Sequence, residues 1–120
     1  MMYQKKTPTI LDCGLHLFME VMSGKWKISL LWSIYHGIKR PSGIHKTITQ
    51  ASRRVLDAQL NQLVLHGLIS RKDYHIKPYK VEYSLTELGH SLIPVIETTA
   101  RWGEENRLVL EEKIFSCSID

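Results

Sequence analysis

Residues 52–83 read SRRVLDAQLNQLVLHGLISRKDYHIKPYKVEY, and this stretch decides the fold. Its first half has the apolar spacing of an amphipathic helix, which Ser52 can cap and Gly67 can end. Two strand patterns follow, at 68–72 and 81–85, and they are expected to pair across a basic loop that contains Pro78. A helix followed by a strand, a basic loop and a second strand is the layout of a winged helix-turn-helix.

The rest of the chain predicts helices on both sides of this unit. Helical spacing covers 10–22, and a nearly all-apolar segment at 25–35 predicts a central core helix that His36-Gly37 ends. A short helix is expected at 43–48, after Pro41 and Ser42. Thr86 should cap a further helix that Pro94 kinks or splits, and Trp102-Gly103 should mark a bend before a last helix at 104–115. The predicted fold class is mainly α with a small β-hairpin wing (α+β).

The chain has 120 residues, which is enough for one domain with a single core. We expect a flexible arm at 1–9, a winged helix-turn-helix domain at 10–115 with its wing at about 68–85, and a tail at 116–120. The sequence shows no membrane span and no evident signal peptide, and Cys13 and Cys117 form neither a disulfide framework nor a zinc motif. A cytoplasmic protein with reduced thiols and no cofactor is therefore expected.

Charge is distributed unevenly along the chain. Residues 36–80 contain nine Lys and Arg against two acids, whereas residues 87–120 contain seven acids against three bases. A basic middle segment suits a polyanion, and an ordinary solvated surface is the alternative. The acidic end would be repelled by the same polyanion, so we expect it to face elsewhere.

The start of the helix after Ser52 gives the sharpest hypothesis about binding. Arg53 and Arg54 lie in its first turn, where a recognition helix comes closest to the bases, so one could fork onto guanine and the other onto a phosphate. Asn61, two turns on, could reach an adenine or the backbone. Asp57 could accept from a cytosine amine or pair with Arg53 or Arg54, and pairing is the preferred interpretation. A solvated helix start is the alternative for the two arginines.

Four lysines complete the predicted DNA-binding set. Lys77 and Lys80 flank Pro78 in the loop between the strands, where a stiff cationic tip would touch phosphates or a minor groove, unless the loop is a plain turn with solubilising charges. Lys46 belongs to the same basic middle segment, near the end of the short helix. Lys25, with Lys27, lies at the start of the second helix, where a lysine and free amides can hold a phosphate.

Several of these motifs together resemble a known family. Cys13-Gly14, Gly24-Lys25-Trp26-Lys27, Gly67-Leu68-Ile69 and Val81-Glu82-Tyr83-Ser84-Leu85-Thr86 occur here in the order found in the HxlR-type winged helix-turn-helix regulators of bacteria, a MarR-like group. The resemblance covers about residues 11–105. It implies a transcription factor whose homodimer joins the first and last helices, at about 10–22 and 87–115, and reads a palindrome in double-stranded DNA. It also places Cys13 where some members sense electrophiles or oxidants.

The residues give a second argument for the dimer and leave the sensor open. The first helix and the last one (Leu108, Val109, Leu110, Ile114, Phe115) carry more large apolar side chains than a small domain can cover, and a twofold dimer would bury them. Cys13 near a helix start suits a reactive thiol, but Asp12 beside it opposes a thiolate, and a buried small apolar residue is the alternative.

We expect no enzyme. The sequence lacks HExxH, GxSxG, Walker and GxGxxG patterns, and its six histidines lack metal-ligand spacing. The rival to DNA binding is a winged helix that binds only proteins. The sequence names no small-molecule effector.

Overall fold

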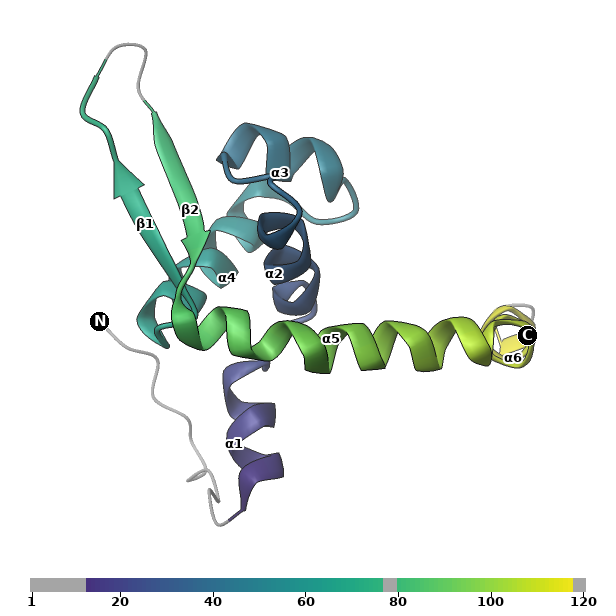
Figure 1. Cartoon of the computed structure of the whole chain (residues 1–120). Helices are drawn as coiled ribbons and strands as arrows, with labels where there is room; N and C mark the ends of the chain where they lie inside the picture. Colours follow the sequence, from purple (N-terminus) through teal and green to yellow (C-terminus); the bar gives the residue numbers. More distant parts are fainter. Residues whose placement is uncertain (1–12, 77–79, 118–120) are drawn as a thin grey trace, which may run out of the picture.

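The computed structural model describes residues 13–76 and 80–117. Within these ranges the chain forms helices and one two-stranded hairpin (Figure 1). The elements in chain order are α1 (Gly14–Val21), α2 (Lys27–Tyr35), α3 (Pro41–Thr47), α4 (Arg53–Leu65), β1 (Ile69–Asp73), β2 (Val81–Leu85), α5 (Glu87–Glu105) and α6 (Arg107–Cys117). The α+β fold class is confirmed. The expected arm at 1–9 lies outside the described residues, as do positions 118–120 of the expected tail.

Helix α2 is the centre of the core, as its sequence predicts. It packs on α3, α4, α5 and β2, and Leu30, Leu31 and Ile34 on it are buried. The surrounding elements close this core with further apolar side chains: Ile44, Ile48, Leu56, Leu60, Leu63, Leu68, Ile69, Val81, Tyr83, Ile93 and Ile96. Helices α2, α3 and α4 and the hairpin therefore form one packed winged-helix body.

The sequence signals at both ends of α4 are confirmed. The Ser52 hydroxyl accepts a hydrogen bond from the Val55 amide, 3.2 Å away, and so caps the first turn. At the other end Gly67 has a φ of +77°, and its amide donates to the Val64 carbonyl while the next amide donates to the Leu63 carbonyl. This pair of bonds is the Schellman motif, which needs a left-handed residue and so favours glycine. The direction in which α4 points is fixed at both ends.

The hairpin is held against the body along one edge. Strands β1 and β2 are antiparallel, with Arg71 opposite Tyr83 and Lys72 opposite Glu82. The Tyr83 amide donates to the Lys39 carbonyl, so the segment before α3 runs beside β2. Because side chains alternate along a strand, Tyr83 and Val81 are buried against the body while Glu82 points to the other face.

Thr86 and Gly89 join α5 to this unit. The Thr86 hydroxyl accepts from the Gly89 amide and donates to the Gly67 carbonyl, so it caps α5 as predicted and also fixes the turn after α4. A Cβ atom on Gly89 would lie 2.1 Å from the carbonyl oxygen of Leu68. Only glycine lets the start of α5 come this close to the backbone before β1.

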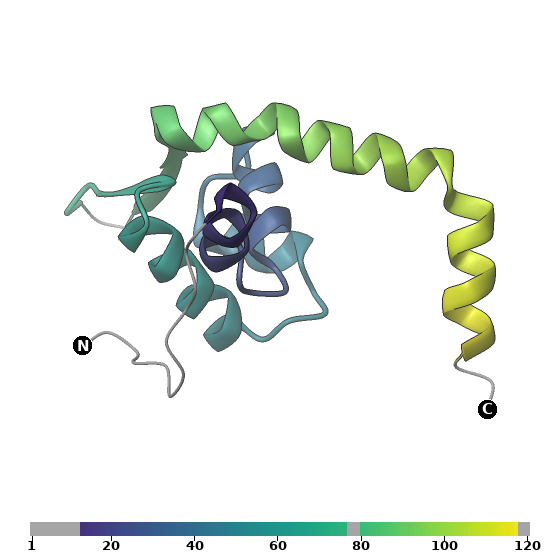
Figure 2. The same cartoon turned by 90° about the horizontal axis from the view of Figure 1, so that it is seen from below.

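The structure differs from the sequence expectations for the C-terminal helices at two points. Of the expected kink or split at Pro94, the split is contradicted, because α5 continues through Pro94 to Glu105 as one gently curved helix (Figure 2). Pro94 and His90 are both solvent-exposed, so the carbonyl that loses its amide partner can be hydrated. The bend lies at Asn106 and not at Trp102-Gly103: Asn106 is the C-cap of α5, with φ −113° and ψ 17°, and its side chain donates to the Trp102 carbonyl.

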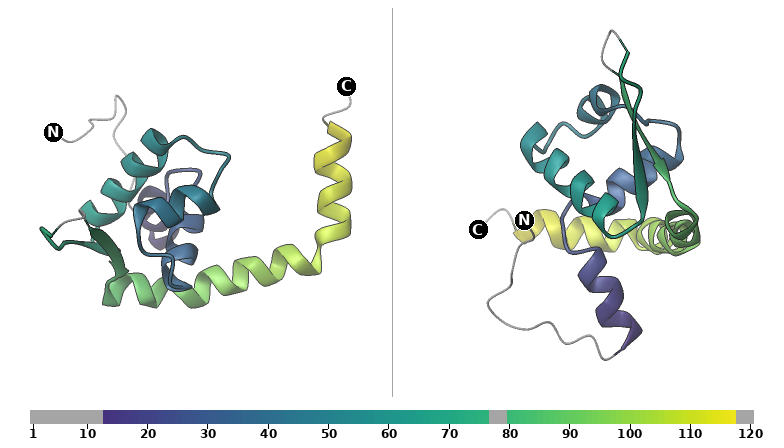
Figure 3. Two further views of the ribbon diagram at one scale, coloured as in Figure 1. Left: turned by 90° about the horizontal axis from the view of Figure 1, so that it is seen from above. Right: turned by 90° about the vertical axis from the view of Figure 1, so that its left-hand side faces the viewer.

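The corner between α5 and α6 is braced by ion pairs. The Arg107 guanidinium donates to Glu104 before the corner and to Glu111 after it. These hydrogen bonds raise the pKa of Arg107, and the one from Arg107 lowers the pKa of Glu104. Helix α6 turns off the end of α5 that is far from the body, to the same side of α5 as the body (Figure 3).

Helices α1, α5 and α6 leave large apolar side chains uncovered. None of the residues of α1 is buried, and the helix extends from the body on its own (Figure 1). The exposed apolar residues of the three helices are Leu15, Leu17, Met19, Leu88, Val95, Trp102, Leu108, Val109, Ile114 and Phe115. Among the described residues, no helix combines the length and the apolar character needed to cross a membrane.

Candidate nucleic-acid interface

Helices α3 and α4 form the helix-turn-helix, and α4 presents the predicted arginines to solvent. Buried Ile44 and Ile48 on one side of the turn pack with the apolar face of α4. Arg53 and Arg54 in the first turn of α4 are both exposed, as the recognition-helix hypothesis requires. The fold thus fixes the inner face of α4 in the core and leaves its first turn accessible.

An exposed, largely polar face runs along α4 from these arginines. Arg54, Ala58 and Asn61 follow helical spacing on one side, and all three are exposed. Lys46, in the last turn of α3, is exposed as well. The structure therefore places four predicted residues on accessible parts of the helix-turn-helix: Arg53, Arg54, Asn61 and Lys46.

Asp57 has a different partner from the one preferred on sequence grounds. Its Oδ1 atom lies 3.2 Å from Nε2 of His45 on α3, and the His45 side chain is only 11% exposed. The preferred pairing with Arg53 or Arg54 considered only neighbours on the same helix, whereas the fold brings a residue of the preceding helix to the carboxylate. The contact links α3 and α4, and it means that the Asp57 carboxylate lies against His45 instead of the expected Arg53 or Arg54.

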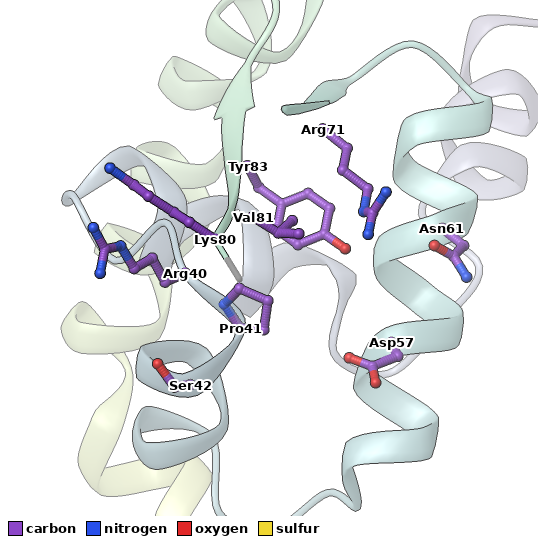
Figure 4. Close-up of a pocket in the computed structure, with 9 residues that line it drawn as sticks. All are labelled: Arg40, Pro41, Ser42, Asp57, Asn61, Arg71, Lys80, Val81 and Tyr83. Carbon is purple, nitrogen blue, oxygen red and sulfur yellow. The ribbon is translucent and has the colours of Figure 1, made fainter. Parts of the chain in front are cut away.

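An open pocket of about 510 Å³ lies between α4 and the hairpin, beside the exposed face of α4. Figure 4 shows Arg71 and Tyr83 extending from the hairpin toward α4, where Asp57 and Asn61 lie. The full lining is Arg40, Pro41, Ser42, Asp57, Asn61, Arg71, Lys80, Val81 and Tyr83. Three cationic side chains (Arg40, Arg71 and Lys80) and one carboxylate (Asp57) belong to this lining.

The outer face of the hairpin carries a separate charged cluster, centred on Glu82. The Tyr74 hydroxyl donates to Glu82 Oε1 over 2.8 Å, and Arg40 and Lys80 lie 3.6 and 3.8 Å from Oε2. The Lys80 ammonium also lies 4.4 Å from the centre of the Tyr74 ring. The hydrogen bond from Tyr74, followed by the two cations, lowers the pKa of Glu82, while the same bond raises the pKa of Tyr74.

This cluster changes the view of Lys80. The sequence places Lys80 at a free cationic tip, but its side chain is held at the base of the loop by Glu82 and Tyr74 and is only 28% exposed. Lys77, the other predicted loop residue, lies outside the described residues. The described part of the hairpin therefore presents Lys80 as one member of a network.

The start of α2 separates its two lysines. Lys27 is only 1% exposed, with its Nζ atom 3.5 Å from the Val21 carbonyl, so its expected share in a phosphate site is wrong. Lys25 is exposed, and its ammonium lies 5.2 Å from the Trp26 ring centre. The Trp26 amide donates to the Gln59 side chain, which places Lys25 beside α4.

Two cationic residues of the pocket, Arg40 and Arg71, were not among the predicted contacts. Strand alternation gives a signal for Arg71: buried Ile69 and Arg71 are two residues apart, so both belong to the face toward α4. Arg40 had no comparable signal, because its position depends on the pairing of Lys39 with Tyr83.

Cys13 is the N-cap residue of α1, and its thiol is free and exposed. The alternative of a buried small apolar side chain is therefore wrong for the isolated chain. No group of three or more His, Cys, Asp or Glu that could hold a metal is present among the described residues.

Comparisons with known proteins agree with this geometry. Residues 21–110 match the HxlR-like helix-turn-helix family. The HTH-type transcriptional regulators YybR and YkvN of Bacillus subtilis (strain 168) are 38% and 42% identical to this chain over 92% and 77% of its length, which corresponds to 90% and 78% of theirs.

The solved structure of the redox regulator HypR in its reduced form superimposes with a TM-score of 0.78 at 38% identity, covering 83% of this chain and 99% of HypR. Both the sequence and the structural likeness extend over most of each chain. The chain therefore belongs to the HxlR-like helix-turn-helix family and is a DNA-binding transcriptional regulator, not an enzyme.

Proposed function

We propose that the chain binds a specific site in double-stranded DNA with α4 as the recognition helix in the major groove, in the cytoplasm. The observation that carries this proposal is the exposed pair Arg53 and Arg54 at the first turn of α4, with Asn61 further along the helix. An arginine guanidinium can donate two hydrogen bonds to the O6 and N7 atoms of guanine. An asparagine amide can form two hydrogen bonds with N6 and N7 of adenine. Lys46, Lys25, Lys80 and Lys77 would contact the backbone around the groove, which positions the helix without reading sequence.

We further propose that two copies act together on a palindromic site. The uncovered apolar side chains of α1, α5 and α6 come from three separate helices, and exposed apolar surface of this kind is a common place for protein–protein contact. A twofold interface would bury the same residues on both copies. It would also place two α4 helices about 34–36 Å apart, on one face of the duplex.

Salt dependence of duplex binding tests the DNA proposal. The affinity of the chain for a duplex selected from a random pool should fall by orders of magnitude between about 50 and 200 mM salt. The reason is that each phosphate contact releases a counterion from the DNA. Fluorescence anisotropy with the full chain measures this. A chain that binds no duplex even at the lower salt would instead support the protein-interaction reading of the winged helix.

Sedimentation velocity tests the dimer. Leu108→Asp should convert dimers to monomers, because it places a charge on a side chain that is 83% exposed in the chain and buried in the proposed interface. Ile76→Asp, an equal charge change at an exposed apolar residue of the hairpin segment, is the control and should leave the dimer intact. A wild-type chain with a monomer mass at all concentrations would contradict the proposal.

A second candidate function is thiol sensing by Cys13. An exposed thiol at the start of α1 is accessible to electrophiles, and the related HypR is named a redox regulator. In this proposal the Cys13 thiol loses its proton to solvent, and the thiolate adds to an electrophile with an activated carbon–carbon double bond. A sulfur–carbon bond forms, the carbon–carbon π bond breaks, and the neighbouring carbon takes up a proton from water. Alkylation of native protein at neutral pH, followed by mass spectrometry, tests it; an unreactive Cys13 would eliminate the sensor.

A further inference from the structure

We propose that Asp57 of α4 contacts a base directly and selects cytosine, and that His45 of α3 is the residue that positions its carboxylate. This inference rests on the proposed function, since it requires α4 to lie in the major groove. It adds to Arg53, Arg54 and Asn61 a contact of the opposite chemistry, because a carboxylate accepts hydrogen bonds where a guanidinium donates them.

Asp57 lies on the same side of α4 as two of the proposed base contacts. It comes three residues after Arg54 and four residues before Asn61, and residues with this spacing share one side of a helix. The Asp57 side chain is 55% exposed, and Figure 4 shows it one turn from Asn61. A helix that presents Arg54 and Asn61 to the groove therefore presents a carboxylate between them.

His45 engages one oxygen of this carboxylate. Nε2 of His45 lies 3.2 Å from Oδ1 of Asp57, and within residues 13–76 and 80–117 no other hydrogen bond or ion pair engages the Asp57 side chain. Because an ionised carboxylate only accepts hydrogen bonds, Nε2 of His45 is the donor. The His45 side chain is 11% exposed, so the surrounding packing limits the movement of its ring. The carboxylate is thus oriented before DNA binds, which reduces the entropy lost on binding.

A carboxylate in the major groove discriminates among the four bases. Guanine presents the acceptors N7 and O6, and thymine presents the acceptor O4, so both repel it, whereas cytosine and adenine each present an amine. In adenine the N6 amine lies beside N7, a further acceptor, whereas no acceptor of the same base lies beside the cytosine N4 amine in the groove. Cytosine is therefore the favoured partner. At other sites the Asp57 charge would meet acceptors and phosphates without compensation, so it also acts against wrong sequences.

A role as a brace between α3 and α4 does not account for the position of Asp57. The two helices already pack through Ile44 and Leu56, which are both buried. A partly exposed ion pair adds little to stability. A carboxylate on the exposed side of α4 also opposes binding to a polyanion, unless it gains a hydrogen bond from a base.

Base-by-base competition with the full chain tests the contact. Each base pair of a duplex selected with wild type is replaced in turn, and wild type is compared with Asp57→Ala, Asp57→Asn and the control Gln62→Ala, at another exposed position of α4. We expect one cytosine in each half-site that wild type and Gln62→Ala prefer by roughly five- to hundredfold. Asp57→Ala should lose this preference alone. It should bind unselected DNA at least as tightly as wild type, because a negative charge has been removed.

Two further comparisons identify the atoms involved. Asp57→Asn should shift the preference toward adenine, with which an amide forms two hydrogen bonds. Deoxyzebularine, the cytosine nucleoside without its exocyclic amine, replaces the preferred cytosine in a second duplex. This replacement should weaken wild-type binding more than binding by Asp57→Ala. The second comparison separates a cytosine contacted by Asp57 from a guanine contacted by an arginine on the opposite strand.

Rescue tests the positioning role of His45. His45→Ala should reduce the cytosine preference, and His45→Gln, which keeps a nitrogen donor on its side chain, should restore it. In an Asp57→Ala background, His45→Ala should not change the preference further. If His45→Gln behaves like His45→Ala, His45 does not position Asp57 through this hydrogen bond.

The contrary results are distinct. A cytosine preference that is unchanged in Asp57→Ala and Asp57→Asn would overturn the inference, and so would equal effects of deoxyzebularine on wild type and Asp57→Ala. Thermal melts show whether the variants fold, and if Asp57→Ala is unfolded, Asp57→Asn decides by the same criterion. A wild type that binds no duplex would refute the proposed function, whereas selective wild-type binding that does not depend on Asp57 would refute this inference alone.

Discussion

The winged-helix body and the helices around it use apolar residues in opposite ways. In the body, Leu56 is 0% exposed and belongs to a core that runs from α2 to the first half of α5. In α6, Leu108 is 83% exposed, although both residues are leucines on helices of similar length. Apolar residues in the body hold a single chain together, whereas the exposed apolar residues of α1 and α6 can be buried only by something outside this fold.

The same division separates the two kinds of surface. The body presents its basic residues on α3, α4 and the hairpin, whereas the acidic residues gather on α5 and α6, where Glu104 and Glu111 brace the corner through Arg107. A polyanion approaching the body therefore meets attraction at α4 and repulsion from the far helices. The comparison predicts that substitutions in the body change folding or DNA binding directly, and that those in α6 act through association.

Gly89→Ala should have the largest effect. The added Cβ would lie 2.1 Å from the Leu68 carbonyl oxygen, and backbone on both sides must move. We expect a loss of unfolding free energy of at least several kcal/mol, above the 1–3 kcal/mol typical of overpacked cores, or no cooperative folding. Urea denaturation followed by circular dichroism measures it.

Gly103→Ala is the matched control, because it makes the same change in the same helix where nothing lies within 4 Å. Helix propensity predicts a gain of up to about 1 kcal/mol there. A large loss at Gly103→Ala would show that another surface closes over the far half of α5, which would sharpen the comparison.

Leu56→Ala and Leu108→Ala compare the two leucines directly. Leu56→Ala should lower the free energy of unfolding by about 2–5 kcal/mol, because it leaves a cavity in the core. Leu108→Ala should change the free energy of unfolding of the dilute, monomeric chain by less than about 0.5 kcal/mol. Urea titrations at two protein concentrations separate folding from association, and equal losses for both variants would break the comparison.

Arg54→Ala should leave folding intact and reduce base discrimination. A bidentate arginine–guanine contact contributes about 1–3 kcal/mol against the wrong base, so the variant should bind selected and substituted duplexes more equally. Arg53→Ala is the companion, since one of the two is expected on a base and the other on a phosphate. Competition binding measures the ratio of affinities for the selected and the substituted duplex. An unchanged ratio in both variants would contradict the role of Arg53 and Arg54 of α4 in base recognition.

Glu82→Gln should have the smallest effect, a loss of stability at neutral pH that disappears in acid. The hydrogen bond from Tyr74 and the nearby cations lower the pKa of Glu82 in the folded chain. The ionised carboxylate therefore stabilises the fold above the ordinary glutamate pKa, and this contribution is lost as pH falls through the lowered folded value. The difference in stability between wild type and Glu82→Gln should shrink as pH falls through that range. A difference that stays constant would assign the Glu82 contribution to packing.

Local signals predicted most of the body. Ser52, Gly67 and Thr86 each have a backbone partner within a few residues, so their capping roles follow from the sequence alone. The strand at 81–85 was predicted with its observed bounds, because its apolar residues alternate beside a turn. The family resemblance agreed with these elements and is confirmed.

Contacts between distant segments could not be predicted in the same way. The partner of Asp57 is twelve residues away in sequence, and the neighbours of Lys80 depend on the hairpin register. The burial of Lys27 depends on how α1 meets α2, since its ammonium approaches the Val21 carbonyl. The corner between α5 and α6 lies at Asn106 and not at Gly103. The Asn106 side chain donates to the Trp102 carbonyl at this corner. Tertiary packing, which a single sequence does not display, decided the cases of Asp57, Lys80 and Lys27, whereas the corner at Asn106 involves a local contact.

Hydroxyl-radical footprinting of the full chain on a selected duplex tests most directly whether two recognition helices bind one site. The account predicts two protected patches related by a twofold axis, on the same face of the DNA and about 10–10.5 base pairs apart. Leu108→Asp should weaken both patches together. One isolated patch with wild-type protein, or protection without any symmetry, would contradict the account.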